Sequence, residues 1–311
     1  MALNIILIII GFLLLIKGAD FLVEGSSGIA KKFHIPEIII GLTIVSIGTS
    51  MPELFVSITS AIGGYEDMAI GNVIGSNLCN LLLILGLSAT INPVVFKKET
   101  KFIEIPMCLI ITIIFTAFCN TGTGISRVEA ITLIILFIIF IGYTIYMGKK
   151  GDNEEITSKP ARKTIVNIIY ILLGIMGLKF GGDFVVENAK DIAEYFKISE
   201  KIISLTIIAI GTSLPELVTS ITASIKGDSD IAIGNILGSN IFNMLLIIGV
   251  SGVINPMTYS HSYNIQMGIL IISTLVLGIF PYTDKKDEMT RSNGISYLML
   301  YALYMVLLFV K

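Results

Sequence analysis

Residues 48–53 read Gly-Thr-Ser-Met-Pro-Glu, and residues 211–216 read Gly-Thr-Ser-Leu-Pro-Glu. Both segments lie inside long apolar stretches typical of membrane helices. Proline and glycine interrupt the hydrogen-bond ladder of a helix, and a membrane tolerates such breaks only where they line a cavity or an ion site. A charged side chain at the bilayer centre costs on the order of 3 kcal/mol. Two breaks that each carry a carboxylate, Glu53 and Glu216, therefore predict one cation site built from two half-helices.

The composition excludes an ordinary soluble domain. The 311 residues are 54% hydrophobic and 14% charged, and the mean hydropathy is +0.88, which together are typical of a polytopic membrane protein. The formal net charge of −2 gives no basis for binding nucleic acid. The three cysteines lie in or beside apolar runs without CxxC spacing, so we interpret Cys79, Cys108 and Cys119 as small buried residues.

The sequence is duplicated at an offset of 163 residues. Aligned without gaps at this offset, residues 35–93 and 198–256 are identical at about 36 of 59 positions. Such internal repeats determine the architecture of a chain and are sought first. The similarity extends upstream, where Gly18, Asp20 and Glu24 recur as Gly181, Asp183 and Glu187.

The apolar stretches predict the helices. About 20 residues are needed to cross the hydrocarbon core of a bilayer. We predict spans at residues 2–30, 35–62, 68–91, 102–119, 127–147, 164–193, 198–225, 231–254, 263–281 and 293–310. The expected fold is an all-α membrane protein with ten transmembrane helices, arranged as two inverted five-helix repeats with broken helices at the midplane. Residues 1–147 form the first half, the charged stretch 148–163 is a linker, and residues 164–311 form the second half.

An odd number of spans in each repeat makes the two copies cross the membrane in opposite directions. One set of loops holds 14 basic residues: Lys31, Lys32, Lys97, Lys98, Lys101, Lys149, Lys150, Lys159, Arg162, Lys163, Lys226, Lys285, Lys286 and Arg291. The opposite set holds five: Arg127, Lys190, Lys197, Lys201 and Lys311. Because basic loops stay in the cytoplasm, we expect a cytoplasmic linker and extracellular termini. Paired broken helices in an inverted repeat indicate the midplane site of a secondary transporter.

A second polar segment follows each break. Residues 71–80 read Gly-Asn-Val-Ile-Gly-Ser-Asn-Leu-Cys-Asn, and residues 234–243 repeat the pattern. Positions four apart share a helix face, which pairs Ser76 with Asn80 and Ser239 with Asn243. Asn77 and Asn240 lie one residue off this face, and we expect them to form hydrogen bonds between helices.

The available ligands favour a hard cation. Calcium takes six to eight oxygen ligands, whereas softer metals prefer thiolate or imidazole. The candidate side chains are Glu53, Glu216, Ser50, Ser213, Ser76, Ser239, Asn80 and Asn243, and the candidate backbone carbonyls are those of Ser46, Thr49, Ala209 and Thr212. Two carboxylates neutralise one divalent ion or two monovalent ions. Without a cation they repel each other, so competition by protons is also expected.

The paired GTS-x-PE and GN-x-x-GSN-x-x-N segments resemble the two alpha-repeats of the cation/calcium exchanger superfamily, and the chain is most similar to its prokaryotic sodium/calcium exchanger branch. The resemblance covers nearly the whole chain. It implies a multi-pass cell-membrane antiporter that exchanges calcium for sodium by alternating access, with the first and sixth helices sliding across a fixed core. It implies no cofactor, since both ions are cargo.

The resemblance also implies roles for single positions. It assigns calcium to Glu53 and Glu216 together with the carbonyls of Thr49 and Thr212. It assigns flanking sodium sites to Ser50, Ser76 and the Ser46 carbonyl, and to Ser213, Ser239 and the Ala209 carbonyl. Asn80 and Asn243 border the central site. Some exchangers of this family carry aspartate in place of one of these asparagines, so this chain has only two formal negative charges at the site.

Other functions remain as alternatives. A calcium/proton antiporter fits the same two carboxylates, and a channel is the alternative to alternating access. A buried glutamate also pairs with a lysine in some proteins, and Lys17 and Lys179 are the membrane-embedded candidates. An enzyme is not expected, because the chain lacks an HExxH zinc signature and Gly181-Gly182-Asp183 falls short of the GxGD pattern of intramembrane aspartyl proteases. We expect the protein to function as a monomer.

Overall fold

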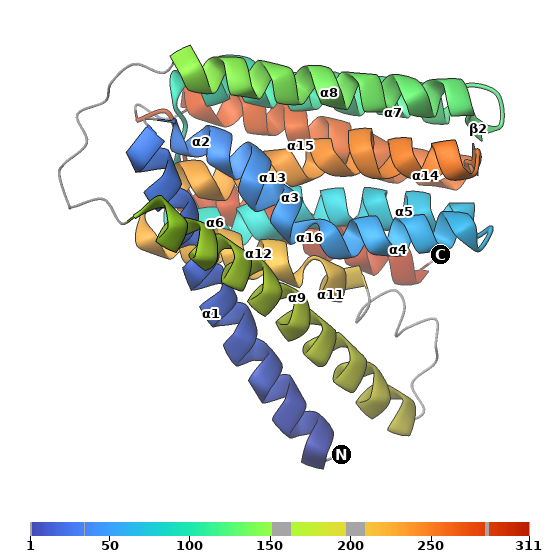
Figure 1. Ribbon diagram of the computed structural model, residues 1–311. Helices are drawn as coiled ribbons and strands as arrows, with labels where there is room; N and C mark the ends of the chain where they lie inside the picture. Colours follow the sequence, from blue (N-terminus) through green and yellow to red (C-terminus); the bar gives the residue numbers. More distant parts are fainter. Residues whose placement is uncertain (1, 34, 151–162, 197–208, 284–285, 311) are drawn as a thin grey trace.

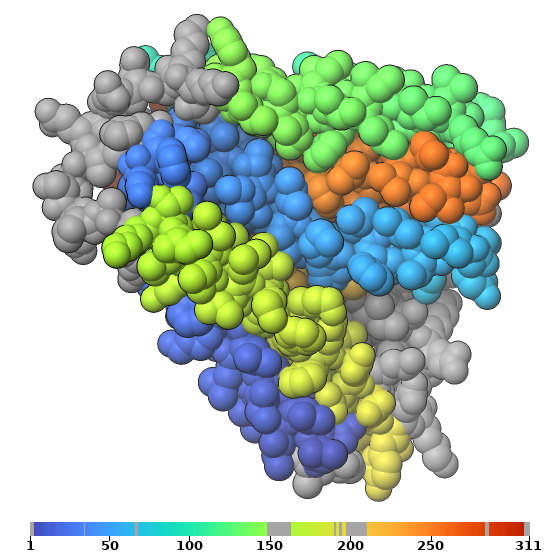
Figure 2. Space-filling view, in the orientation of Figure 1, coloured from blue at the N-terminus to red at the C-terminus, as the bar shows by residue number. Residues whose placement is uncertain are grey.

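The computed structural model describes residues 2–33, 35–150, 163–196, 209–283 and 286–310. Most of these residues are helical, and the strands are only two residues long. Figure 1 shows most of the helices stacked side by side, while α1 (Ala2–Phe33) and α9 (Thr164–Tyr195) run together and slant away from the stack. In the space-filling view the surfaces of these two helices form a wedge beside the stack (Figure 2).

The first half of the chain is built around a broken helix and a bulged helix. After α1 come α2 (Glu37–Ile40), the π-helical turn η1 (Gly41–Val45), α3 (Ser46–Thr49), α4 (Met51–Ile62), α5 (Glu66–Leu78), the π-helical turn η2 (Cys79–Ile84), α6 (Leu85–Ile91), β1 (Val94–Val95), the π-helical turn η3 (Thr100–Glu104), α7 (Ile105–Cys119), β2 (Gly124–Ile125) and α8 (Arg127–Lys150).

The second half repeats this order. After α9 come α11 (Ala209–Thr212), α12 (Leu214–Lys226), α13 (Ser229–Phe242), the π-helical turn η5 (Asn243–Ile247), α14 (Ile248–Ile254), β3 (Met257–Thr258), the 3₁₀ turn η6 (His261–Tyr263), α15 (Asn264–Thr283), β4 (Glu288–Met289) and α16 (Arg291–Val310). Nine of the predicted spans coincide with helical stretches whose ends differ by at most three residues. Of the tenth, 198–225, residues 198–208 lie outside the described residues, as do residues 151–162 of the linker.

The helices have the length and hydropathy of membrane spans. Among the described residues, seven helices are long and apolar enough to cross a membrane, or eight if the bent pair Glu37–Thr49 and Met51–Ile62 forms one span. Large apolar side chains face outward along α1, where Leu3, Ile9 and Leu13 are 65%, 55% and 59% exposed. A continuous apolar exterior of this kind is suited to lipid. The chain is therefore an all-helical membrane protein.

The two bulged helices form the centre of the stack. In the apolar 18-residue window of the span Ser229–Ile254, 94% of the residues are buried, and in that of Met68–Ile91 72% are, compared with 22–39% for the windows of the five other long spans. These are the helices that carry the Gly-Asn…Gly-Ser-Asn segments. Serine and asparagine are costly against lipid, so burial on all sides is the expected position for such helices.

Helices α1 and α9 pack through glycines at backbone contact. A Cβ atom added to Gly181 would lie 2.7 Å from the carbonyl oxygen of Gly11 and 2.8 Å from the amide nitrogen of Leu15. A Cβ added to Gly18 would lie 2.7 Å from the amide nitrogen of Leu178. Small residues allow membrane helices to approach this closely, which explains why α1 and α9 run together although they belong to different repeats.

Two short strand pairs join loops of the two halves. β1 pairs antiparallel with β4, with Val94 opposite Met289, and β2 pairs antiparallel with β3, with Ile125 opposite Met257. At the offset of 163 residues, β1 corresponds to β3 and β2 lies one residue out of register with β4. β1 therefore pairs with β4, the counterpart of β2, and β3 pairs with β2, the counterpart of β4. Both pairs join a loop of one half to a loop of the other.

We expect the glycine contact between α1 and α9 to tolerate no side chain. Gly181→Ala would force the helix backbones apart, and overpacking of this kind costs about 1–3 kcal/mol. The adjacent Gly182 is the matched control, because nothing lies within 4 Å of a Cβ atom added there. Gly182→Ala should leave the thermal midpoint in detergent unchanged or raise it, since alanine is the better helix former, while Gly181→Ala lowers it. Equal midpoints would contradict the contact.

Candidate ion-binding site

Each motif glutamate lies in the first turn of a helix that begins at a break. α3 ends at Thr49 and α4 begins at Met51, and the helical stretches Glu37–Thr49 and Met51–Ile62 are bent by 50° relative to each other. Pro52 lies in the first turn of α4, where its missing N–H leaves no helical bond unmade. Between the helices Ser50 has φ −82° and ψ 10°, and the equivalent Ser213 has φ −87° and ψ 6°. The two copies of the motif therefore bend the chain in the same way.

The two breaks meet, and each glutamate is bonded to the serine of the other copy. The Ser50 hydroxyl donates to Glu216 Oε1 at 2.7 Å, and the Ser213 hydroxyl donates to Glu53 Oε1 at 3.3 Å. Both carboxyl groups are 1% exposed and lie close enough to repel each other. The structure thus brings the acids of the two repeats into one buried place.

Helix geometry compensates part of this negative charge. Glu53 and Glu216 occupy the first turns of α4 and α12, where the partial positive charge of a helix N-terminus favours a carboxylate. Serine hydroxyls satisfy Oε1 of each acid. The threonine side chains also contribute, since Thr212 lies against Glu53 and Thr49 against Glu216. These contacts offset part of the cost of burying two carboxylates but leave one oxygen of each, Oε2, without a hydrogen-bond partner among the described residues.

Five buried oxygens of the predicted ligand set have no hydrogen-bond partner within the described part of the chain. They are Glu53 Oε2, Glu216 Oε2, Ser76 Oγ, Asn80 Oδ1 and Asn243 Oδ1. Nearly all buried polar groups in proteins are paired, and an unpaired buried acceptor costs on the order of 1–3 kcal/mol. Buried oxygens with free lone pairs are the donors that a hard cation accepts. The described residues contain no group of three His, Cys, Asp or Glu side chains arranged for a metal, so neutral oxygens have to complete any coordination shell.

The remaining predicted ligands lie beside Glu216 or at the two breaks. The Ser239 hydroxyl donates to Glu216 Oε1 at 3.5 Å. The Ser46 carbonyl accepts from the Ser50 amide at 3.0 Å and from the Thr49 hydroxyl at 3.3 Å. Thr212 is the last residue of α11, and Ala209 is its first. All twelve predicted positions therefore lie at the breaks or on the two central helices.

The sequence reasoning gave no role to Asn72 and Asn235. The Asn235 amide donates to the Ser220 hydroxyl at 2.9 Å and to the Glu216 carbonyl at 3.5 Å, and its oxygen accepts from Thr49 at 3.0 Å. Asn72 makes the equivalent bonds to Ser57 at 3.2 Å and to the Glu53 carbonyl at 3.5 Å. These amides fix the helix turn that carries each glutamate. The signal in the sequence was that asparagine occurs at both positions, which are 163 residues apart.

The lysine pairing that was an alternative for the buried acids does not occur. Lys17 lies 3.8 Å from Asp20, and Lys179 lies 3.1 Å from Asp183, in each case on its own helix. In the described residues no ion pair involves Glu53 or Glu216. The three cysteines are buried and free, as predicted.

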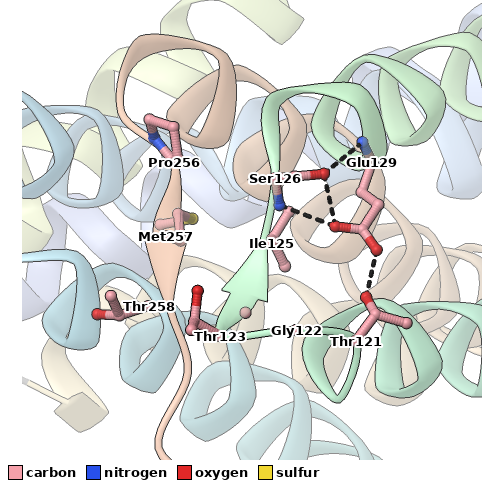
Figure 3. A pocket seen from close by; sticks show the side chains of 10 residues that line it. Thr121, Gly122, Thr123, Ile125, Ser126, Glu129, Pro256, Met257 and Thr258 are labelled. Carbon is pink, nitrogen blue, oxygen red and sulfur yellow. Dashed lines mark hydrogen bonds between the residues drawn. The ribbon is translucent and has the colours of Figure 1, made fainter.

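A surface hollow of about 430 Å³ lies apart from this site, beside β2 and β3 (Figure 3). Its single carboxylate is that of Glu129, which accepts from the Ser126 amide at 2.8 Å and the Ser126 hydroxyl at 2.7 Å and also from Thr121. The Glu129 amide in turn donates to the Ser126 hydroxyl at 3.3 Å. This reciprocal pattern is a capping box at the start of α8, so Glu129 has a structural role.

Comparison with known proteins supports the assignment of the chain. Residues 3–146 and 166–310 match the sodium/calcium exchanger protein family. The chain is 31% identical over 98% of its length to the sodium/calcium exchanger MaX1 of Methanosarcina acetivorans, of which it covers 98%. It is 36% identical over 87% of its length to the inner membrane protein YrbG of Escherichia coli, of which it covers 87%.

A solved structure has the same fold. The sodium-calcium exchanger NCX_Mj, in crystals soaked with sodium and strontium, superposes with a TM-score of 0.87 at 33% identity, and the match covers 98% of each chain. The matched family segments cover both halves of the chain and both copies of the motif. The members of this family are exchangers rather than enzymes. This protein therefore belongs to the sodium/calcium exchanger protein family.

Proposed function

We propose that the protein is a secondary active antiporter that exchanges calcium for sodium across the cell membrane. The observation that carries this proposal is the set of five unpaired buried oxygens in the predicted ligand set, one of them on Glu53 and one on Glu216. Two carboxylates balance the charge of one calcium ion or of two sodium ions, so occupancy by the two ions is mutually exclusive on charge grounds. Family membership and the relatives named as sodium/calcium exchangers support the same pair of ions.

In this proposal the central site holds calcium. Glu53 and Glu216 supply the charge, the carbonyls of Thr49 and Thr212 supply neutral oxygens, and Asn80 and Asn243 border the ion. Six to eight oxygens are usual for calcium, and this set approaches that number from protein groups alone. The crossed bonds from Ser50 to Glu216 and from Ser213 to Glu53 support a site shared by both halves.

Sodium takes flanking positions. One is formed by Ser50, Ser76 and the Ser46 carbonyl, and the other by Ser213, Ser239 and the Ala209 carbonyl. The unpaired Ser76 hydroxyl supports the first of these sites. No cofactor is needed, because both ions are transported. All twelve candidate ligands come from one chain, so we expect a monomer to be sufficient.

The proposed topology has ten spans in two inverted halves, residues 1–147 and 164–311, joined by the linker 148–163. The pairing of β1 with β4 supports it, because both strands belong to loops of the basic set, and β2 with β3 joins loops of the opposite set. The linker is then cytoplasmic, and both termini are extracellular. The close packing of α1 on α9 supports movement of these two helices as one body during alternating access.

We expect Glu53→Gln and Glu216→Gln each to reduce sodium-driven calcium uptake at least about a hundredfold, equal to about 2.8 kcal/mol. The amide keeps the size of the side chain but removes one of the two charges that balance calcium. The measurement is the initial rate of radioactive calcium uptake into proteoliposomes loaded with sodium.

The matched control for this loss is Glu104→Gln. Glu104 is also a buried carboxylate, at 2% exposure, but it lies in η3, away from the breaks. This variant should retain uptake, and all three proteins should elute as folded monodisperse species in detergent. Uptake at the wild-type rate by either Glu53→Gln or Glu216→Gln would contradict the assignment of the site.

A calcium/proton antiporter is the second candidate, because two facing carboxylates that repel each other are a natural place for a proton. We expect an outward sodium gradient to drive calcium uptake, and a pH gradient of equal size imposed without sodium to drive little. Both gradients are applied separately to the same proteoliposomes, with the membrane potential clamped. Calcium uptake that follows the pH gradient and ignores sodium would identify the protein as a proton antiporter.

A further inference from the structure

Four asparagines form a closed hydrogen-bond network between the two central helices. Asn77 is on α5, Asn80 is in η2, Asn240 is on α13 and Asn243 is in η5. Their exposures are 0%, 1%, 1% and 1%. Asn240 and Asn243 are the repeat equivalents of Asn77 and Asn80, so the network is built from two copies of one element.

The bonds of the network obey the symmetry of the repeat. The Asn77 amide donates to the Asn240 carbonyl at 3.3 Å, and the Asn240 amide donates to the Asn77 carbonyl at 3.3 Å. The Asn80 amide donates to Asn240 Oδ1 at 3.1 Å, and the Asn243 amide donates to Asn77 Oδ1 at 2.9 Å. We call Asn77 and Asn240 the inner asparagines and Asn80 and Asn243 the outer ones. Each outer asparagine is thus held by the inner asparagine of the opposite half.

The backbone determines which way every amide in this network faces. A backbone carbonyl only accepts, so Asn77 and Asn240 have to present their NH₂ groups to each other's main chain. Their side-chain oxygens are then left as acceptors. Asn80 has to present its NH₂ group to the Asn240 oxygen, and the Asn80 oxygen faces elsewhere. The same reasoning applies to Asn243.

The oxygens at the free ends of the Asn80 and Asn243 amides belong to the set of unpaired oxygens described above. Asn80 Oδ1 and Asn243 Oδ1 are buried and have no hydrogen-bond partner among the described residues. If either amide turned over, its NH₂ group would take the position of a cation ligand, and a donor there would repel the ion. The network excludes that orientation, because the turned amide would also place its oxygen against the oxygen of the inner asparagine.

We propose that Asn77 and Asn240 are positioning residues that keep the carbonyl oxygens of Asn243 and Asn80 available to the transported cation. The proposal rests on the function proposed above. It also bears on specificity, since positions 80 and 243 have to donate a hydrogen bond to the inner asparagines. An ionised aspartate at either position would place oxygen against oxygen. The network therefore requires a neutral hydrogen-bond donor at these two positions, which leaves two charged carboxylates at the site, the charge that balances one hard divalent ion.

The network predicts which pairs of substitutions are coupled. Asn240→Ala and Asn80→Ala should each raise the calcium concentration for half-maximal uptake about tenfold, with the maximal rate within about twofold of wild type. The double variant should show the same tenfold increase rather than a hundredfold one, because Asn240 acts through Asn80. The variants Asn77→Ala and Asn243→Ala, and the double variant that combines them, should show the same coupling.

The matched control pairs are Asn77 with Asn80 and Asn240 with Asn243. Alanine at position 77 keeps the backbone carbonyl to which Asn240 donates, so Asn240 still holds Asn80. The effects on the half-maximal concentration should therefore multiply within these pairs. Effects that multiply in all four pairs, or changes confined to the maximal rate, would overturn the proposal.

A second readout separates this proposal from the proposed function. The rise in thermal midpoint that calcium produces in detergent reports binding without transport, and it should show the same coupling. Serine variants are made in parallel in case an alanine variant does not fold. If the wild-type protein transports no calcium and calcium does not stabilise it, the proposed function fails. If wild type binds and transports calcium but the coupling is absent, only the positioning proposal fails.

Discussion

The structure depends on the need to keep two carboxylates together inside an apolar protein. Each is expensive to bury alone, and two side by side repel each other. Three features offset this cost: the helix N-terminus beneath each acid, the serine bond from the opposite copy and the neighbouring oxygens that are able to share a cation. The second feature requires that the two breaks face each other, because Ser50 reaches Glu216 only in that arrangement. The meeting of the two halves is therefore a direct consequence of the motif.

This meeting determines the packing around it. The broken helix of the first half has to lie against α13, and the glycines of the second polar segment make that contact possible. A Cβ atom added to Gly238 would lie 2.7 Å from the Ser46 hydroxyl and 2.8 Å from the Leu42 carbonyl. Any residue larger than glycine at position 238 would push the broken helix of the first half, with its break after Thr49, away from α13. The small and polar residues of the segment thus have separate roles, since glycine provides proximity and asparagine provides direction.

The sequence was sufficient to predict nine of the ten helical stretches and to indicate that the two breaks, with Glu53 and Glu216, come together. Apolar length determines the spans, and a repeated proline and glutamate mark the interruptions. The π-helical turns were not predictable, because they depend on packing that local pattern does not record, yet η2 and η5 carry Asn80 and Asn243 and π-bulges are frequent at functional sites. The roles of Asn72 and Asn235 depend on which helix lies opposite, which a repeat offset alone does not reveal. The strand pairs escaped prediction because two residues carry no periodicity.

The two halves are nevertheless not equivalent where the slanting pair meets the stack. Lys226, at the end of α12, lies 2.9 Å from Asp20 and 3.8 Å from Glu24 on α1. The residue equivalent to Lys226 in the first half is Gly63, which has no charge to offer, and Asp183 on α9 pairs with Lys179 of its own helix. If α1 moves along the stack as the proposed function requires, it has to break the Lys226 pairs, whereas the described residues show no equivalent contact in the first half. Partly exposed ion pairs contribute only about 0–1 kcal/mol each, so they bias one arrangement of α1 without locking it. Under the proposed alternating access, one lysine at the periphery would therefore make the two states of α1 unequal.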